Sequence, residues 1–302
     1  MGLLYPPDCA LQCYHSSWRI ALELLFCLAI VAAYIPQYVK IARSSTTVGI
    51  SSHYVLSHVL FSTTALFIRI ANDVYYDAFN CVRNGDLKGW EAVSTLTGYL
   101  QVIVQWLCAM ALLVMFLHHY DRERHQETEQ NALSPEIIKK TVSTFAAVFL
   151  PVAAVFLWQN DEAWTKPGMS WGFVVYVLML GLIMFVLKLL FTLLYPMGQF
   201  WYQFRLLRSM ASPGALSIVS TALMSLSFVA LAVLQLLSSW PNLYLEWKSD
   251  VGQLSLFSAW YTRLSLVLGY FAAGIVQLAL FVFSWYCGWR DTMESVGPVH
   301  LD

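Results

Sequence analysis

The sequence predicts an all-α polytopic membrane protein with seven transmembrane helices, in a 3+1+3 arrangement of two parallel three-helix repeats. Three observations lead to this fold class: the composition, the number of long apolar segments, and an internal repeat. Of the 302 residues, 59% are hydrophobic and 12% are charged, whereas soluble domains are about 25% charged. The 12 Trp residues suit a chain that meets two membrane interfaces, where aromatic rings concentrate. We therefore expect a lipid bilayer to surround most of the chain.

Seven apolar segments approach the ~20 residues that a helix needs to cross about 30 Å of hydrocarbon. In order they are residues 18–38, 54–70, 93–117, 142–158, 171–194, 216–237 and 264–285. The longest polar connection, residues 118–140, is expected to extend the third helix by a turn or two. It should break near Ser134-Pro135, because proline cannot continue the hydrogen-bond ladder of a helix.

The basic residues are distributed unequally between the two sides of the predicted bundle. Nine lie on the side of the C-terminal tail, namely Lys40, Arg43, Arg122, Arg124, Lys139, Lys140, Arg205, Arg208 and Arg290. Five lie on the other side, namely Arg19, Arg83, Lys88, Lys166 and Lys248. Because cytoplasmic loops carry the excess of Lys and Arg, we expect a cytosolic C-terminus and a non-cytosolic N-terminus. Residues 1–8 do not have the pattern of a cleavable signal, so the first apolar segment is expected to be retained as a span.

An internal repeat relates the first three spans to the last three. Residues 98–105 (GYLQVIVQ) and 269–277 (GYFAAGIVQ) both begin with Gly-Tyr and end with Gln. Residues 37–51 and 203–217 both begin with Gln, contain basic residues, and end with Ser after a nearby glycine, Gly49 or Gly214. Chance similarity between apolar helices is the alternative, but the match in the polar loops favours duplication. Two such units joined by a single span would have parallel orientations.

The segment that begins with Pro36-Gln37 and ends with Gly49-Ile50-Ser51 resembles a PQ-loop motif. The PQ-loop family includes lysosomal cystine and basic amino-acid exporters and is similar to the SWEET sugar transporters. The resemblance covers nearly the whole chain. It implies one three-helix bundle per repeat, a substrate path between the bundles, and a vacuolar, lysosomal or other endomembrane location. In the second copy, Tyr202 stands where the family has proline, although Gln203 keeps its register. Pro196 could supply the hinge there instead.

Pro36 and Gln37 also have an expected physical role of their own. Proline removes a backbone donor and clashes with the preceding turn, so a kink and a hinge are expected at the cytosolic end of the first span. Carbonyl groups freed in a membrane must find other donors, and the Gln37 amide can donate and accept. The alternative is a plain helix terminus, where Pro and Gln need no special role.

Several ionisable residues lie inside the predicted spans, where such side chains usually face a partner or a cavity. Glu23 and Lys188 occupy nearly equivalent positions of the two repeats. They could pair across the bundle interface or belong to a proton or solute path, although Lys188 could instead extend to the interface. Arg69 and Asp73 are four residues apart and could pair with each other, or Asp73 could take part in the proton path.

Three glutamines are candidates for a substrate path, namely Gln101, Gln105 and Gln277. Gln101 and Gln105 share one helix face, and Gln277 is the repeat equivalent of Gln105. Interhelical hydrogen bonding, worth about 0.6–2 kcal/mol, is the structural alternative, and it is favoured for His58 and Gln235. Convergence of Gln37, Gln203, Gln105 and Gln277 on one polar cavity would favour a carrier.

The six cysteines do not have metal-type CxxC spacing, and we expect neither a metal nor another cofactor. Cys27, Cys108 and Cys287 lie in or beside apolar segments and are expected to act as small hydrophobes. The remaining three, Cys9, Cys13 and Cys81, share the predicted non-cytosolic side, and a disulfide among them is left open.

The sequence favours a transporter of a small polar solute, such as an amino acid, that works by alternating access and is coupled to protons. A membrane adaptor or lipid-organising protein of the same fold is the alternative. A receptor is disfavoured because span seven lacks NPxxY, and an enzyme because no catalytic motif is found. The net charge of −1 argues against a nucleic-acid partner.

The predicted organisation has four parts. Residues 1–117 form the first repeat with its N-terminal segment, and residues 118–170 form the cytosolic loop and linker helix. Residues 171–287 form the second repeat, and residues 288–302 form the cytosolic tail.

Overall fold

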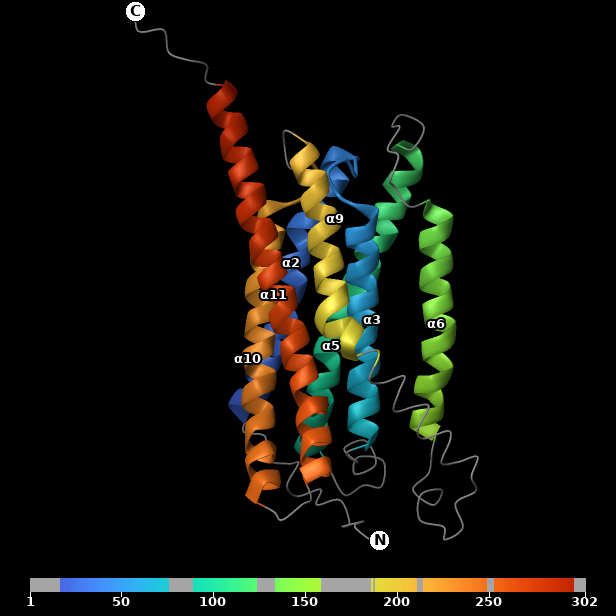
Figure 1. The fold of residues 1–302 in the computed structure, drawn as a ribbon, viewed down its shortest axis with the longest axis vertical. Helices are drawn as coiled ribbons and strands as arrows, with labels where there is room; N and C mark the ends of the chain where they lie inside the picture. The colour runs from blue at the N-terminus through green and yellow to red at the C-terminus, as the bar shows by residue number, and fades with distance from the viewer. Residues whose placement is uncertain are drawn as a thin grey trace, which may run out of the picture.

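The computed structural model describes residues 17–75, 89–123, 134–158, 186, 188–210, 214–248 and 253–295. These residues form seven α-helices and one π-helical turn, and Figure 1 shows that the helices lie side by side along the long axis. Their bounds are α2 Ser17–Ser44, α3 Ser52–Tyr75, α5 Trp90–Glu123, α6 Pro135–Trp158, η1 Leu190–Leu194, α9 Tyr195–Ser209, α10 Ile218–Lys248 and α11 Gln253–Ser295. The all-helical prediction is therefore confirmed for the described part of the chain.

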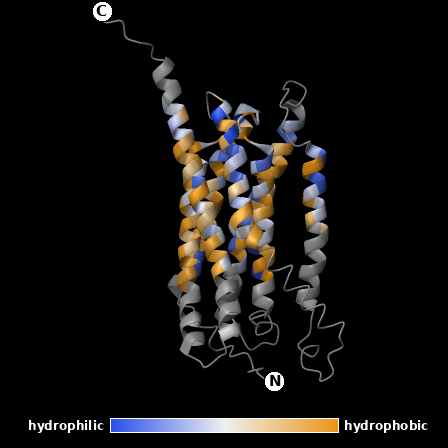
Figure 2. Ribbon diagram, in the orientation of Figure 1, coloured by the Kyte–Doolittle hydropathy of each residue, from blue (hydrophilic) through white to orange (hydrophobic). Residues whose placement is uncertain are grey.

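Four of the described helices are long and apolar enough to cross a membrane. The segments that meet this criterion are Ile20–Ser44, Tyr99–Tyr120, Ile218–Leu237 and Leu264–Trp289. Large apolar side chains on these helices remain exposed, for example Leu28 at 69% and Leu226 at 68%. Figure 2 shows hydrophobic residues along the middle of the helices and hydrophilic ones toward one end. Because water would penalise such a surface, the protein is integral to a lipid bilayer.

Two sets of three helices pack in the same way. In the first set, α5 contacts both α2 and α3, and in the second set α11 contacts both α9 and α10. The sets meet through two equivalent contacts, because α2 packs against α10 and α9 packs against α3. Exchanging the sets therefore leaves this pattern of contacts unchanged. Helix α6 packs mainly on α3 and stands at the side of the bundle in Figure 1.

The helices are longer than their apolar segments. Helix α2 continues to Ser44 and α9 to Ser209, so Gln37 and Gln203 lie inside helices and not beyond their ends. Helix α2 runs through Pro36 without ending or breaking, so the alternative of a plain helix terminus is wrong, and the kink and hinge stay predictions. Helix α5 extends to Glu123 and α6 begins at Pro135, as the polar connection predicts.

A π-helical turn interrupts the regular geometry before Pro196. It comprises Leu190–Leu194, and Pro196 lies buried in the first turn of α9. Short π-turns shift the helical register and occur frequently at functional sites. In the second set, the irregular turn therefore lies next to Pro196, the residue that the sequence offered as an alternative hinge. This position is earlier in the helix than the one equivalent to Pro36 of α2.

Candidate functional site

The first feature of the site is a hydrogen-bonded clamp between Gln37 and a loop of the other helix set. Gln37, on α2, is 3% exposed. Its Nε2 donates to the Ala215 carbonyl at 2.9 Å, and its Oε1 accepts from the Ser217 backbone N–H at 2.8 Å. Lys40 Nζ adds a hydrogen bond to the Leu216 carbonyl at 2.7 Å. One side chain therefore satisfies two backbone groups of the loop that precedes α10.

Gln203, on α9, forms the equivalent clamp in the opposite direction. Its Nε2 donates to the Gly49 carbonyl at 2.7 Å, and its Oε1 accepts from the Ser51 backbone N–H at 2.9 Å. It is fully buried. Each set thus holds the first loop of the other, and we call these the reciprocal glutamine clamps. Both loops lie at the end of the bundle where α11 ends (Figure 1).

The two clamped loops also contact each other directly. The Ala215 N–H donates to the Val48 carbonyl at 2.6 Å. Gly214 has φ +55°, and a Cβ on it would lie closer than 3.0 Å to the Val48 carbonyl oxygen, so only glycine fits without displacement. The hydrogen bonds make Ala215 the equivalent of Gly49, at the same offset as the two glutamines. The sequence match of Gly49 with Gly214 was therefore wrong by one residue.

Pro36 lies one residue before the first clamp. Proline cannot donate to the carbonyl four residues earlier, which is that of Ala32. Ser220 Oγ of α10 donates to the neighbouring Ala33 carbonyl at 2.6 Å, so the other helix set contacts this turn. The sequence predicted that Gln37 would donate to the freed carbonyl. Its amide instead forms hydrogen bonds with Ala215 and Ser217.

The second feature is a chain of polar side chains between the helix sets. Tyr54 of α3 donates to Gln277 Oε1 of α11 at 3.3 Å, and Gln277 Nε2 donates to Gln199 Oε1 of α9 at 3.3 Å. Tyr270 of α11 donates to Gln105 Oε1 of α5 at 3.0 Å. The three glutamines are fully buried. Two of the three pairs, Tyr54–Gln277 and Tyr270–Gln105, therefore link helices of different sets.

His58 of α3 completes this arrangement. It is fully buried, and its Nε2 is hydrogen-bonded to the Tyr34 hydroxyl of α2. The Gln199 amide lies beside the imidazole. We call His58, Tyr34, Tyr54, Gln105, Gln199, Tyr270 and Gln277 the central polar cluster.

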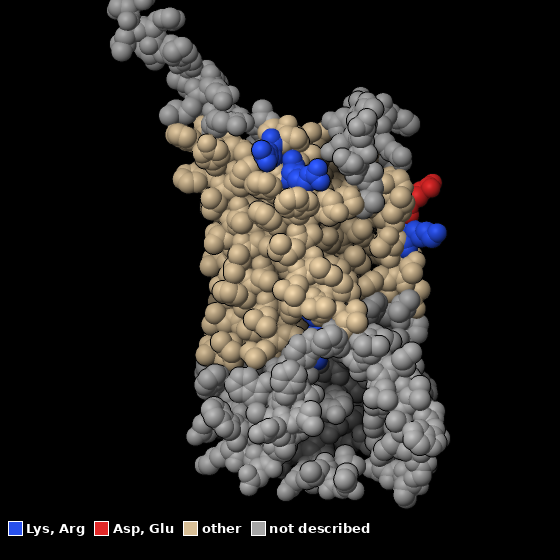
Figure 3. Space-filling view, viewed as in Figure 1, with Lys and Arg blue, Asp and Glu red and all other residues tan. Residues whose placement is uncertain are grey.

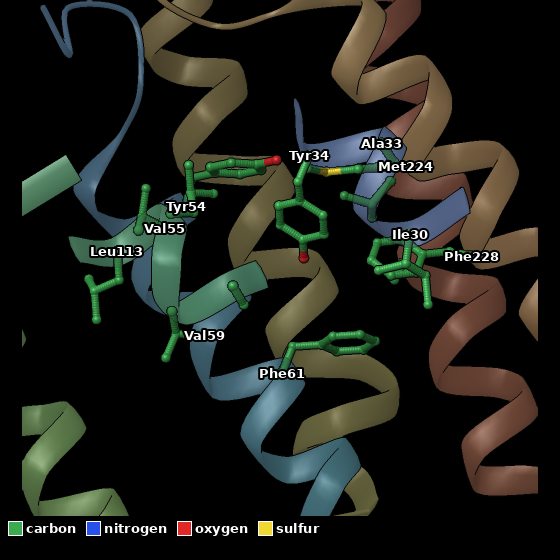
Figure 4. Close-up of a cluster of buried hydrophobic side chains, with 14 of the residues drawn as sticks. Ile30, Ala33, Tyr34, Tyr54, Val55, Val59, Phe61, Leu113, Met224 and Phe228 are labelled. Atoms are coloured by element: carbon green, nitrogen blue, oxygen red, sulfur yellow. The ribbon is translucent and has the colours of Figure 1, made fainter. Parts of the chain in front are cut away.

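Aromatic rings hold the central polar cluster in place. The His58 ring centroid lies 5.6 Å from that of Tyr34, 6.0 Å from that of Tyr54 and 6.1 Å from that of Phe228. Phe228 lies 6.2 Å from Tyr270 and so connects the two groups of hydrogen bonds. Figure 4 shows Tyr34 and Tyr54 directed from different helices into the interior of the bundle.

Three buried polar atoms of the cluster have no hydrogen-bond partner among the described residues. They are His58 Nδ1, Gln105 Nε2 and Gln199 Nε2. Leaving one such group unpaired costs about 1–3 kcal/mol. The aromatic rings around His58 hold its imidazole in a buried position. The side chain therefore cannot rotate into solvent to avoid this cost. The cluster therefore has unused capacity to bind a polar molecule.

Charged side chains form a third feature, farther from the clamped loops. Glu23 of α2 is 4% exposed and accepts a hydrogen bond from the Thr97 hydroxyl of α5. Gln101 Nε2 donates to the Glu23 backbone carbonyl at 3.2 Å. The Arg69 guanidinium lies 5.6 Å from the centre of the Tyr99 ring. Lys188 is 6% exposed. The side chain of Asp73 lies outside the described residues, and its pairing with Arg69 stays a prediction, as does a Glu23–Lys188 pair.

The predicted site residues thus divide between levels of the bundle. Gln37 and Gln203 bind loops, Gln105 and Gln277 belong to the central polar cluster, and Gln101 contacts Glu23. The four glutamines expected in one cavity therefore occupy two separate places. Cys9, Cys13 and Cys81 lie outside the described residues, while Cys27, Cys108 and Cys287 are thiols that are not joined in disulfides.

Sequence reasoning placed Gln105 and Gln277 in the site but not the other members of the central polar cluster, which are Tyr34, Tyr54, His58, Gln199 and Tyr270. Gln199 was not singled out, although it precedes Gln203 by four residues and so shares its helix face. His58 was interpreted as a structural residue because interhelical hydrogen bonding is the commoner role of a polar side chain in a span. Its partners Tyr34 and Gln199 come from other helices. The helix-face spacing could have revealed Gln199, but no local signal predicts the contacts of His58.

Comparison with known proteins found no matching family model, no matching curated protein and no matching solved structure.

Proposed function

We propose that this protein is a PQ-loop type transporter, which carries a small polar solute through the membrane by alternating access. The single observation that carries this proposal is the central polar cluster, whose three unpaired atoms lie between the two helix sets. Buried polar groups in membrane proteins are costly and mark substrate or ion paths by default. Secondary carriers place their substrate between structural repeats near the middle of the bilayer.

The proposed architecture has seven spans, with α2, α3 and α5 as the first repeat, α6 as the linker, and α9, α10 and α11 as the second repeat. The equivalent packing of the two sets and the reciprocal glutamine clamps support it. Figure 3 shows Lys and Arg side chains toward the end where the clamped loops lie. By the positive-inside rule, we assign this end and the C-terminus to the cytosol, in a vacuolar, lysosomal or related endomembrane.

The reciprocal glutamine clamps would then act as the cytosolic gate. Their four hydrogen bonds, together with that of Lys40, tie the loops of one repeat to the helices of the other. The described conformation is closed at this end, and release of the loops would give the central polar cluster access to the cytosol. Solute binding that favours one conformation shifts the population toward it.

Solute uptake into proteoliposomes tests the proposal. The purified protein is given a panel of amino acids, sugars and small organic acids, with and without a pH gradient. Gln199→Leu removes an amide of the central polar cluster, and Gln235→Leu is the matched control because Gln235 lies outside it on α10 and is also buried. We expect Gln199→Leu to lose at least about ten-fold in uptake, the effect of one hydrogen bond to solute. A protein that carries none of these solutes would instead support an adaptor.

A further inference from the structure

The central polar cluster contains one histidine, His58, which is the member able to gain a proton near neutral pH. His58 is the imidazole of the cluster, and its remaining members are tyrosines and glutamines. Tyrosine ionises only near pH 10, whereas histidine changes its charge near neutral pH. A protonated His58 could donate from both ring nitrogens, with Nε2 serving Tyr34 and Nδ1 left for a ligand.

The unpaired atoms around His58 determine what kind of ligand fits. Gln199 Oε1 already accepts from Gln277, so the unpaired atom that Gln199 presents is its Nε2, a donor. A protonated His58 adds a second donor to the cluster, at Nδ1. N–H donors from two side chains of one buried cluster match the two oxygens of a carboxylate, which accepts hydrogen bonds and does not donate them.

Charge balance connects the proton to this ligand. A carboxylate or an imidazolium alone in a buried site suffers a large desolvation penalty, but the pair neutralise one another. The groups that face His58 from the packed helices are uncharged near neutral pH: Tyr34 of α2, Tyr54 of α3, Gln199 of α9, Phe228 of α10 and, through Phe228, Tyr270 of α11. The charge of Arg69 reaches Tyr270 at the edge of the cluster, although Arg69 is eleven residues from His58 along α3. Glu23 and Lys188 are likewise eleven residues from Tyr34 and Gln199 along their helices, or about 16 Å at 1.5 Å per residue.

We infer that the central polar cluster binds the carboxylate of a small solute together with one proton on His58, with Gln199 Nε2 and His58 Nδ1 donating to its two oxygens. This inference rests on the proposed transport function and names its substrate class and its proton carrier. One proton enters the site with each carboxylate and leaves with it. A monocarboxylate such as lactate is then carried without net charge, whereas a zwitterion such as glycine carries one positive charge.

The experiment uses the full chain in proteoliposomes that contain a pH-sensitive dye. Lactate, its amide lactamide, and glycine are supplied outside, with a pH gradient or a potassium diffusion potential imposed separately. We expect an acidic exterior to drive lactate uptake with acidification of the lumen, and no uptake of lactamide. Glycine uptake, unlike lactate uptake, should respond to the potential.

The variant His58→Gln keeps a polar side chain but cannot carry a proton. We expect its lactate uptake to fall about ten-fold or more, the effect of losing a hydrogen bond to a charged group, and to lose its dependence on the pH gradient. His119→Gln is the control, since His119 lies near the end of α5 beside His118 and outside the central polar cluster.

The outcomes separate this inference from the proposed function. Uptake of lactamide or sugars alone would leave the transporter intact and overturn the inference, as would lactate uptake without proton entry. Retention of gradient-dependent uptake by His58→Gln would also overturn it. If no solute is carried, both fail as statements about transport. Thermal stabilisation by lactate at acidic pH, absent in His58→Gln, would then still support the binding site, and its absence would overturn that too.

Discussion

Replacing Gln37 by methionine tests the gate most directly, because methionine has similar length but cannot make either strong hydrogen bond. In the closed state, the change leaves the Ala215 carbonyl and the Ser217 N–H without the partners that the structure gives them. Each unpaired buried group costs about 1–3 kcal/mol, so the closed state loses about 2–6 kcal/mol. The open state, in which water reaches the loops, does not lose this energy. The ratio of open to closed protein should therefore rise by about 30-fold or more.

Cysteine labelling measures this shift. Leu216 is 1% exposed in the closed state, so a cysteine introduced there in a cysteine-free background reacts with a maleimide when the loops separate. We expect faster labelling in Gln37→Met and, because its clamp is equivalent, in Gln203→Met. Gln235→Met is the control for replacing a buried glutamine elsewhere. Labelling rates within about two-fold of the parent in both clamp variants would mean that the clamps contribute less than their geometry implies.

Three further predictions concern packing, and thermal unfolding in detergent checks each of them. Gly214→Ala should destabilise the protein by about 1–3 kcal/mol, because its φ is +55° and the added Cβ meets the facing loop; an unchanged midpoint would contradict this. Gly274→Ala should lower the midpoint, since its Cβ would lie 2.7 Å from Val229 Cγ2, and Val229→Ala in the same chain should restore it. Thr97→Val should cost about 1–3 kcal/mol by removing the donor to the buried Glu23 carboxylate, and Glu23→Gln should be milder because its amide oxygen still accepts; equal losses would refute this role for the carboxylate.

The sequence predicted the elements of the fold better than their meeting points. Apolar length located the helices, because crossing hydrocarbon demands it, but it placed the end of α2 too early. Pro36 and the basic residues after it resemble a terminus, whereas α2 continues through them to Ser44 and Gln37 contacts the loop before α10. Such a contact joins residues that are far apart in sequence, so local sequence patterns do not predict it.

The candidate site shows the same division. The equivalence of Gln37 and Gln203 was visible as a repeat, and their burial with equivalent hydrogen bonds agrees with it. That each binds the loop of the other set was not visible, because a glutamine at a helix end has many potential partners. His58 was undervalued for the same reason, since its importance depends on an unpaired Nδ1 that only three-dimensional packing reveals.

Each clamping glutamine binds main-chain atoms alone. Gln37 binds the carbonyl of residue 215 and the N–H of residue 217, and Gln203 binds the carbonyl of residue 49 and the N–H of residue 51. Selection on such a contact acts on the glutamine and on the path of the opposing backbone, and it leaves most loop side chains free to drift. Gly49 and Ala215 differ as residues but accept equivalent hydrogen bonds from the two glutamines. Relatives of this chain would then be recognised more readily by their crossed hydrogen bonds than by the letters of their loops.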